Sequence, residues 1–192
     1  MRFNTISGML VLFVCLIAAG GCEKKAEEPK AEGALDISVE PDPVTIAPVE
    51  GEYTIRVTAQ ETGGAAVDLT QATVVITYLD STHIMMGPID LTVTKMTWTA
   101  TTPEEGGPAV GLLEQFWHLD AGASKEYELP LKVGTETTAP EGFPGIYFPV
   151  AYIQAALGAG KSGFMVTLTY EATDANGHLL FGTFSLRIQI QT

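Results

Sequence analysis

Cysteine is almost absent from this chain, and positive charge is scarce. The only two cysteines among 192 residues are Cys15 and Cys22, so the sequence beyond them can form no disulfide, thiolate metal site or thiol nucleophile. The chain has 10 lysines and arginines against 23 aspartates and glutamates, a net charge of −13. An acidic surface repels nucleic acid, so no nucleic-acid partner is expected. The one long apolar run, residues 9–19, is shorter than the roughly 20 residues of a membrane span.

Residues 1–21 are typical of a cleaved export signal, with a basic start at Arg2, the apolar run and then small residues before Cys22. The stretch 17–22 resembles a bacterial lipobox, with Ala19 where leucine is usual. The resemblance implies an envelope lipoprotein that is cut before Cys22 and carries acyl chains on that cysteine, so that lipid holds it to the membrane. Glu23 stands where aspartate retains lipoproteins in the inner membrane of enteric bacteria. This favours the outer membrane, with the domain facing the periplasm or the cell surface.

The residues after the cysteine divide into a tether and a domain. Residues 22–33 are charged, are punctuated by proline and glycine, and offer nothing to a core. Such a composition predicts a disordered tether after the lipidated cysteine. Residues 34–192 are enough for a single hydrophobic core.

Alternation of apolar and polar residues, rich in threonine, valine, isoleucine and tyrosine, dominates the domain and predicts half-buried strands. One short helix at most is expected, over 150–157, between Pro149 and Gly158. The fold class is therefore all-β, an antiparallel immunoglobulin-like sandwich. Within the expected strand 89–100, the apolar residues change from odd to even positions near 94–95. This change predicts a β-bulge there. The expected strands cover 35–39, 52–59, 72–79, 89–100, 110–119, 126–133, 164–171 and 184–191.

Two segments also resemble a known group of domains. Residues 117–133 are similar to a strand, turn and strand of bacterial immunoglobulin-like adhesion repeats, and residues 166–177 look like their closing hairpin with its Asn-Gly turn. The resemblance implies the sandwich fold and leaves function open.

Aromatic residues gather in 142–149, between glycines and prolines, which predicts a structured loop. Loops of this kind on rigid sandwiches often recognise proteins or glycans. Phe143, Tyr147 and Phe148 are therefore the candidate partner-binding residues, and the partner would be another envelope protein or a glycan. The alternative is that these rings close one open end of the core.

A second hypothesis is a periplasmic metal site. His83, Met85 and Met86, with Met96 further on, form the only cluster of soft donors, and imidazole and thioether ligands suit Cu(I). The same methionines could instead fill the core. No cofactor is expected, and no metal outside this alternative.

No catalytic residue is predicted, and the chain is expected not to be an enzyme. The sequence has no Gly-x-Ser-x-Gly element, although a hydrolase triad assembled in space stays an alternative. Residues 158–162 resemble only the end of a phosphate-binding loop and lead into a strand, which indicates an ordinary loop. The stretch 174–177 offers too few oxygens for calcium and is interpreted as a turn.

Overall fold

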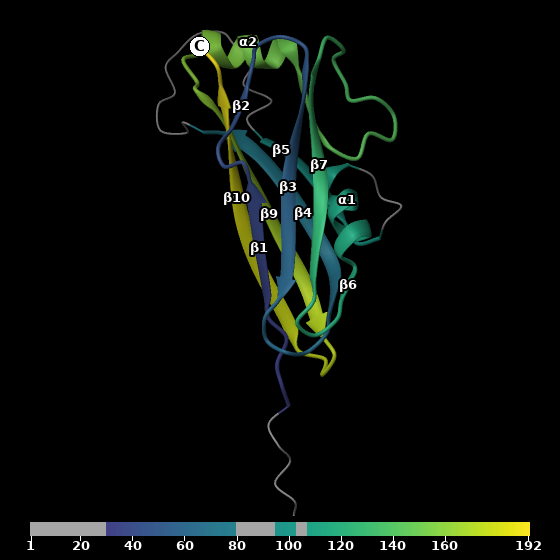
Figure 1. Cartoon of the computed structure of the whole chain (residues 1–192). Helices are drawn as coiled ribbons and strands as arrows, with labels where there is room; N and C mark the ends of the chain where they lie inside the picture. The colour runs from purple at the N-terminus through teal and green to yellow at the C-terminus, as the bar shows by residue number, and fades with distance from the viewer. Residues whose placement is uncertain (1–29, 80–94, 103–106) are drawn as a thin grey trace, which may run out of the picture. The chain divides into compact units, whose positions relative to one another are not determined.

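The computed structural model describes residues 30–79, 95–102 and 107–192, and the chain divides into two units, Met1–Lys30 and Ala31–Thr192. Apart from Lys30, the described residues all belong to the second unit. Its elements, labelled in Figure 1, are β1 (Leu35–Glu40), β2 (Val44–Ile46), β3 (Gly51–Glu61), β4 (Val67–Tyr78), β5 (Lys95–Ala100), α1 (Pro108–Phe116), β6 (His118–Leu119), β7 (Ser124–Gly134), β8 (Ile146–Pro149), α2 (Val150–Gly158), β9 (Gly163–Asp174) and β10 (Leu179–Ile190). None of the described helices is long and apolar enough to cross a membrane.

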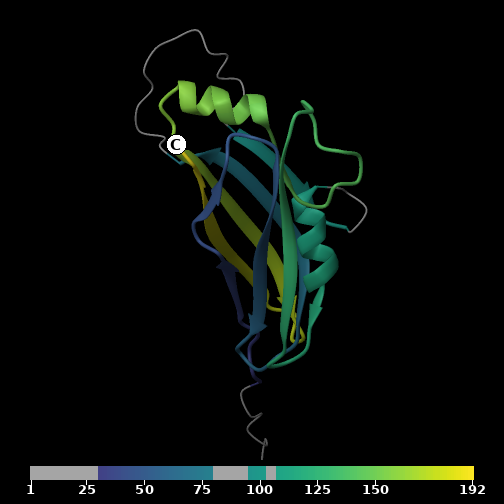
Figure 2. The same cartoon turned by 45° about the horizontal axis from the view of Figure 1, so that its top comes forward.

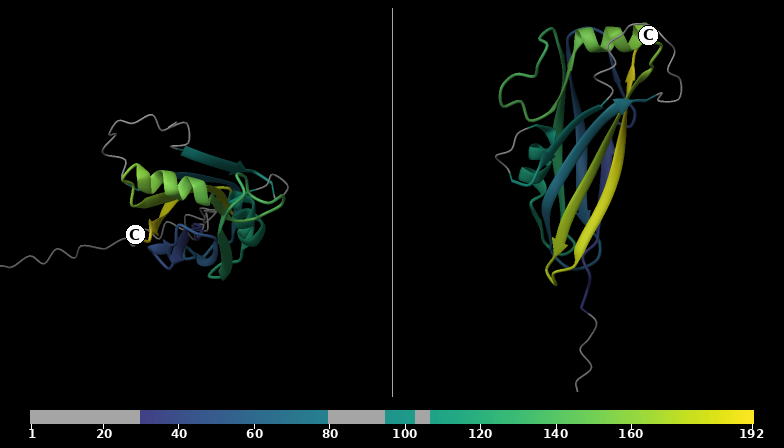
Figure 3. Two further views of the ribbon diagram at one scale, coloured as in Figure 1. Left: turned by 90° about the horizontal axis from the view of Figure 1, so that it is seen from above. Right: turned by 180° about the vertical axis from the view of Figure 1, so that it is seen from behind.

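The strands form two sheets. A four-stranded sheet has the order β1-β3-β7-β8, and a six-stranded sheet has the order β2-β10-β9-β4-β5 with β6 beside β4. Figure 3, from behind, shows β4, β9 and β10 side by side in the second sheet. The coarser part of the fold prediction, a mostly β domain with two sheets, is confirmed.

The sheets are mixed, which corrects the expectation of purely antiparallel pairing. β2 runs parallel to β10, and β8 runs parallel to β7. After β1 the chain crosses to the other sheet at 41–43 and continues as β2. The prolines at 41 and 43 offer no amide hydrogen to a ladder, so pairing with β3 ends there. The loop 135–145 leads back from the end of β7, and β8 then runs in the same direction as β7.

The predicted alternation places the core correctly. One face of each long strand is buried and belongs to a single cluster between the sheets, and the other face is exposed. The buried positions include Ile55, Val57, Leu129, Leu131, Val133, Val166, Leu168, Leu186 and Ile188. Burial of this apolar surface is the main source of stability, at roughly 25 cal/mol per Å².

The helix α1 was not predicted: the region 110–119 was expected to be a strand, and only His118–Leu119 is one. Pro108 begins the helix, where its missing amide hydrogen costs nothing. The buried Ala109, Leu112, Leu113 and Phe116 follow helical spacing and face the core. The expectation of at most one helix is therefore wrong. The expected helix near 150–157 is α2, which lies across one end of the sandwich (Figure 2).

The predicted strand over 89–100 is β5 where it is described, and the bulge expected at 94–95 stays a prediction because residue 94 lies outside the described residues. A register shift is found between Leu69 and Gln71, in the pairing of β4 with β9. The expected hairpin turn at 174–177 joins β9 to β10, with Gly177 at φ 85°.

Two buried carboxylates hold the end of the sandwich at which β1 begins. Glu61, 1 % exposed, accepts hydrogen bonds from four backbone amides, those of Ala34 (3.1 Å), Gly63 (2.6 Å), Gly64 (3.0 Å) and Gly122 (2.7 Å). Burial by itself raises the pKa of the Glu61 carboxyl, but these amides outweigh it and lower the pKa from 4.5 to about 2.

The second carboxylate, Asp174, is 4 % exposed. One oxygen accepts the amide of Gly33 at 3.0 Å and the Nδ1 of His178 at 2.9 Å, and the other accepts the amides of Asn176 and His178, both at 2.8 Å. The Gly33 hydrogen bond is the largest cause that holds the pKa of Asp174 well below its ordinary value. The side-chain amide of Asn176 also donates to the Ala31 carbonyl at 2.7 Å. Both Ala31 and Gly33 are therefore hydrogen-bonded to the β9–β10 turn. Part of the segment expected to be tether, 31–33, therefore lies in the folded unit.

We predict that Glu61→Gln lowers the free energy of unfolding by about 2 kcal/mol at neutral pH, because an amide replaces a charge-assisted acceptor and brings its own donor against the loop amides. The depressed pKa of Glu61 stabilises the fold above pH 4.5, and this stabilisation is lost as the pH falls from 4.5 toward 2. Urea unfolding at a series of pH values should show that the difference in free energy of unfolding between wild type and variant shrinks as the pH falls from 4.5 toward 2. Glu114→Gln, at an exposed position of α1, is the matched control. A gap that does not change with pH would contradict this role.

Candidate functional site

The best candidate for a binding site is a cavity of about 450 Å³, here called the aromatic hollow. Its walls come from β5, the start of α1, the loop before β8 and the start of α2, which the two cartoons in Figures 1 and 2 show at the upper part of the unit. The residues that line it are Met96, Trp98, Gly107, Pro108, Thr137, Thr138, Ala139, Pro140, Gly142, Phe143, Gly145, Tyr147, Pro149 and Tyr152.

Four aromatic rings, those of Trp98, Phe143, Tyr147 and Tyr152, line this hollow. Trp98 packs against Gly107, where any Cβ would collide with the indole ring. Phe143 meets Tyr147 edge to face, with ring centroids 6.4 Å apart. Tyr147 is nearly buried, and its hydroxyl donates to the backbone carbonyl of Glu136 at 3.0 Å. Three of the four rings therefore pack against neighbouring protein groups at the cavity, a feature of preformed ligand sites.

The polar groups of the hollow are uncharged. None of the described residues that line it is acidic or basic. The indole nitrogen of Trp98 and the hydroxyls of Tyr152, Thr137 and Thr138 make no hydrogen bond to any other described residue. The hollow thus combines apolar ring surfaces with hydrogen-bonding groups that are available to a ligand.

The structure brings Phe143 and Tyr147 together, as expected of partner-binding residues, but it separates Phe148 from them. Phe148 is fully buried and stacks on Phe164 with centroids 4.4 Å apart. The expectation that Phe148 faces a partner is corrected, because its ring is part of the core. The alternative that these rings close one end of the core holds for Phe148, which belongs to the core cluster; Tyr147 is buried on the opposite face of β8, outside that cluster.

The predicted metal ligands His83, Met85 and Met86 lie outside the described residues, and Met96 lines the aromatic hollow. Within the described part of the chain, no three histidine, cysteine, aspartate or glutamate side chains gather as metal ligands would. Cys22, the predicted lipidation site, also lies outside the described residues.

The two described histidines each pair with aspartate. His118 is hydrogen-bonded to Asp68 at 2.6 Å and to Asp120 at 3.3 Å. These hydrogen bonds raise the pKa of the His118 imidazole, and the bond to Asp68 is the largest cause. His178 contacts the buried Asp174. Neither imidazole is hydrogen-bonded to a serine among the described residues, so neither completes the triad that a hydrolase alternative requires.

Both loops that resembled ligand motifs have structural roles. The carboxylate of Asp174 is occupied by the amide and imidazole donors of its own turn and of Gly33, which fits a turn rather than a calcium loop. Gly158 is the last residue of α2, Gly160 comes two residues later, and β9 begins at Gly163, so the glycines are followed by a strand and not by the helix that phosphate binding needs. Lys161 lies 5.9 Å from the centroid of the Tyr78 ring.

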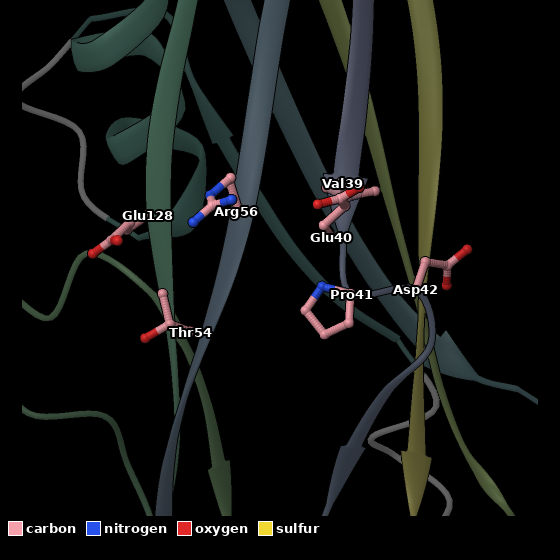
Figure 4. Close-up of a pocket in the computed structure, with 7 residues that line it drawn as sticks. All are labelled: Val39, Glu40, Pro41, Asp42, Thr54, Arg56 and Glu128. Atoms are coloured by element: carbon pink, nitrogen blue, oxygen red, sulfur yellow. The ribbon is translucent and has the colours of Figure 1, made fainter.

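A larger and more open cavity of about 810 Å³ lies on the outer face of β1, β3 and β7 (Figure 4). Arg56 sits there in register with Glu40 and Glu128, and its Nε pairs with Glu126 at 2.9 Å. Figure 4 shows Asp42 pointing away from Arg56, and Asp42 instead accepts the Arg187 amide at 3.0 Å, the largest cause of its lowered pKa. Arg56 and Asp42, two of the charged groups of this cavity, are thus paired with residues that do not line it, which favours the aromatic hollow as the binding site.

The sequence did not indicate Trp98, Tyr152, Thr137 or Thr138 as site residues. A signal existed only for Trp98, which shares the apolar parity of Met96 and so projects with it from the same face of β5. The other three reach the hollow through the packing of α2 and of the loop 135–145, which no local pattern specifies.

No family model matches this chain, and no curated protein does. Among solved structures, it is similar to the putative ApaA protein from Bordetella pertussis, at 14% identity over 83% of this chain and 98% of that one, with a TM-score of 0.40. It is also similar to murine CRIg, at 8% identity over 83% and 100% with a TM-score of 0.40. A third is AggA, the major subunit of aggregative adherence fimbriae type I from Escherichia coli, at 7% identity over 84% and 97%, with a TM-score of 0.32. These are distant likenesses, and no functional assignment is drawn from them.

Proposed function

We propose that the chain is a non-enzymatic, lipid-anchored protein of the bacterial cell envelope. In this proposal an immunoglobulin-like sandwich, of the adhesion-repeat kind that residues 117–133 and 166–177 resemble, presents the aromatic hollow as a binding site for another envelope component. The observation that carries the proposal is the hollow itself, a cavity lined by four rings on a strongly acidic chain, with no charged side chain among the lining residues that the structure describes.

The anchoring part rests on the first 22 residues. Their charge, apolar run and small residues before Cys22 match an export signal of the lipoprotein kind. A single acyl chain binds membranes only reversibly, whereas the two or three chains of a lipoprotein cysteine anchor firmly. The outer membrane is the proposed location because Glu23 follows the cysteine.

The place where the chain enters the domain supports this arrangement. Ala31 and Gly33 are bonded to the β9–β10 turn at one end of the sandwich, while α2 and the loop 135–145 lie at the opposite end (Figure 1). A domain held through its N-terminal lipid would therefore be attached at one end and would carry the hollow toward the other. That position suits capture of a component away from the anchoring membrane surface.

The lipid anchor makes a direct prediction. Mass spectrometry of the N-terminal peptide from the native protein should show that residues 1–21 are absent and that Cys22 bears two or three acyl chains. Cys22→Ala should move the protein from the membrane to the soluble fraction, because the acidic domain has no attraction to anionic head groups. An unmodified Cys22 thiol in membrane-bound material would refute the anchor.

The binding role of the hollow is tested by cross-linking in intact cells. With p-benzoylphenylalanine in place of Tyr152, illumination should give a covalent adduct, because this side chain lines the cavity. The same group in place of Phe181, an aromatic residue that is 65% exposed but is not among the residues lining the hollow, should give none. Trp98→Ala should reduce the adduct about tenfold, in line with the loss of a buried aromatic contact.

Trp117→Ala is the matched tryptophan control, since Trp117 is 44% exposed and is not among the lining residues. Circular dichroism of each variant shows whether it is folded. Equal adducts from positions 152 and 181 would argue against the hollow as the binding site.

A further inference from the structure

We propose that the aromatic hollow binds an uncharged saccharide. This inference rests on the proposed function, because it assigns a class of ligand to the same site. Three properties of the described lining residues lead to it: their ring surfaces, polar groups that are bonded to no other described residue, and the absence of acidic and basic side chains among them.

The ring surfaces match the apolar faces of a sugar. A pyranose presents C–H groups on its two faces and hydroxyls around its edge, so aromatic side chains can pack on the faces while polar groups meet the edge. Trp98, Phe143 and Tyr152 are half-buried at the hollow, which leaves part of each side chain open to a ligand. Two of these rings already have close protein neighbours without a ligand: Trp98 packs against Gly107, and Phe143 meets Tyr147 edge to face.

The unpaired polar groups match the edge of a sugar. The indole of Trp98 is a donor only, while the hydroxyls of Tyr152, Thr137 and Thr138 both donate and accept. A saccharide hydroxyl also does both, so each group can be satisfied. A proline-rich peptide, the other common ligand of aromatic grooves, offers mainly carbonyl acceptors and would leave the acceptor capacity of the hydroxyls unused.

The lack of charge selects a neutral ligand. An ion buried in the hollow would lose its hydration without gaining an opposite charge from the described lining residues. The chain has 23 acidic residues, and Glu136 and Glu141 lie in the loop that adjoins the hollow, where they repel acidic sugars. The cavity volume of about 450 Å³ lies in the range of small-molecule sites.

Tryptophan emission tests this inference directly. The chain has two tryptophans, so Trp117→Phe leaves Trp98 as the only reporter, placed in the hollow. The full-length protein is purified in lauryldimethylamine oxide, because glycoside detergents would compete for the site. Maltotetraose, cellotetraose and chitotetraose are titrated separately, with decaproline and tetragalacturonate as the peptide and acidic-sugar probes.

At least one neutral tetrasaccharide should shift the Trp98 emission saturably, and tetragalacturonate should not. Tyr152→Phe and Thr138→Val should each weaken that binding about threefold to tenfold, the effect of one lost hydrogen bond. Thr45→Val, at an exposed threonine of β2, is the matched control and should leave the affinity unchanged.

Two results would overturn the saccharide assignment. One is no response to any neutral saccharide up to its solubility limit. The other is a response to decaproline or tetragalacturonate that equals or exceeds that to the neutral sugars. If the adduct from position 152 persists in either case, the proposed function stands and only the ligand class is wrong. If that adduct is also absent, the proposed function and the saccharide assignment are both refuted.

Discussion

The end of the sandwich where β1 begins depends on two carboxylates that are bound mainly by backbone amides rather than by cations. Glu61 joins the amide of Ala34 to those of two turns, and Asp174 joins Gly33 to the β9–β10 turn. Loop amides at such an end have no ladder partner, and a buried carboxylate satisfies several at once. The first residues of the folded unit are thereby fixed to both sheets, so a pull along the N-terminal segment would act on this network and on β1 together.

The opposite end is organised by close contacts rather than by charge. Two glycines provide space for two of the rings of the aromatic hollow: Gly107 lies against Trp98, and Gly134 lies against Tyr147, where in each case a Cβ would collide with the ring. The Tyr147 hydroxyl is bonded to Glu136, which ties its ring to the loop that carries Phe143. Rings fixed in this way lose little conformational freedom on binding, so more of their contact energy is available for affinity.

The sequence was informative wherever a strand is long and has one buried face, as in β3, β7, β9 and β10. It failed at β2, β6 and β8, since strands of 3, 2 and 4 residues are too short to show a period, and all four residues of β8 are buried. It also misassigned α1, although Ala109, Leu112, Leu113 and Phe116 have helical spacing. Of the hollow, only Phe143, Tyr147 and Met96 were candidates, because its walls come from segments that tertiary packing alone brings together.

The acidic charge of the chain bears on both attachment at one end of the sandwich and binding at the other. Because the chain has a net charge of −13, anionic lipids and polymers are repelled from it at long range and not attracted. Under the proposed function, attachment would come from a group that needs no electrostatic help, which a covalent lipid provides. Recognition would be short-range for the same reason, and the aromatic hollow, with no charged side chain among its described lining residues, suits contact and hydrogen bonding at short range.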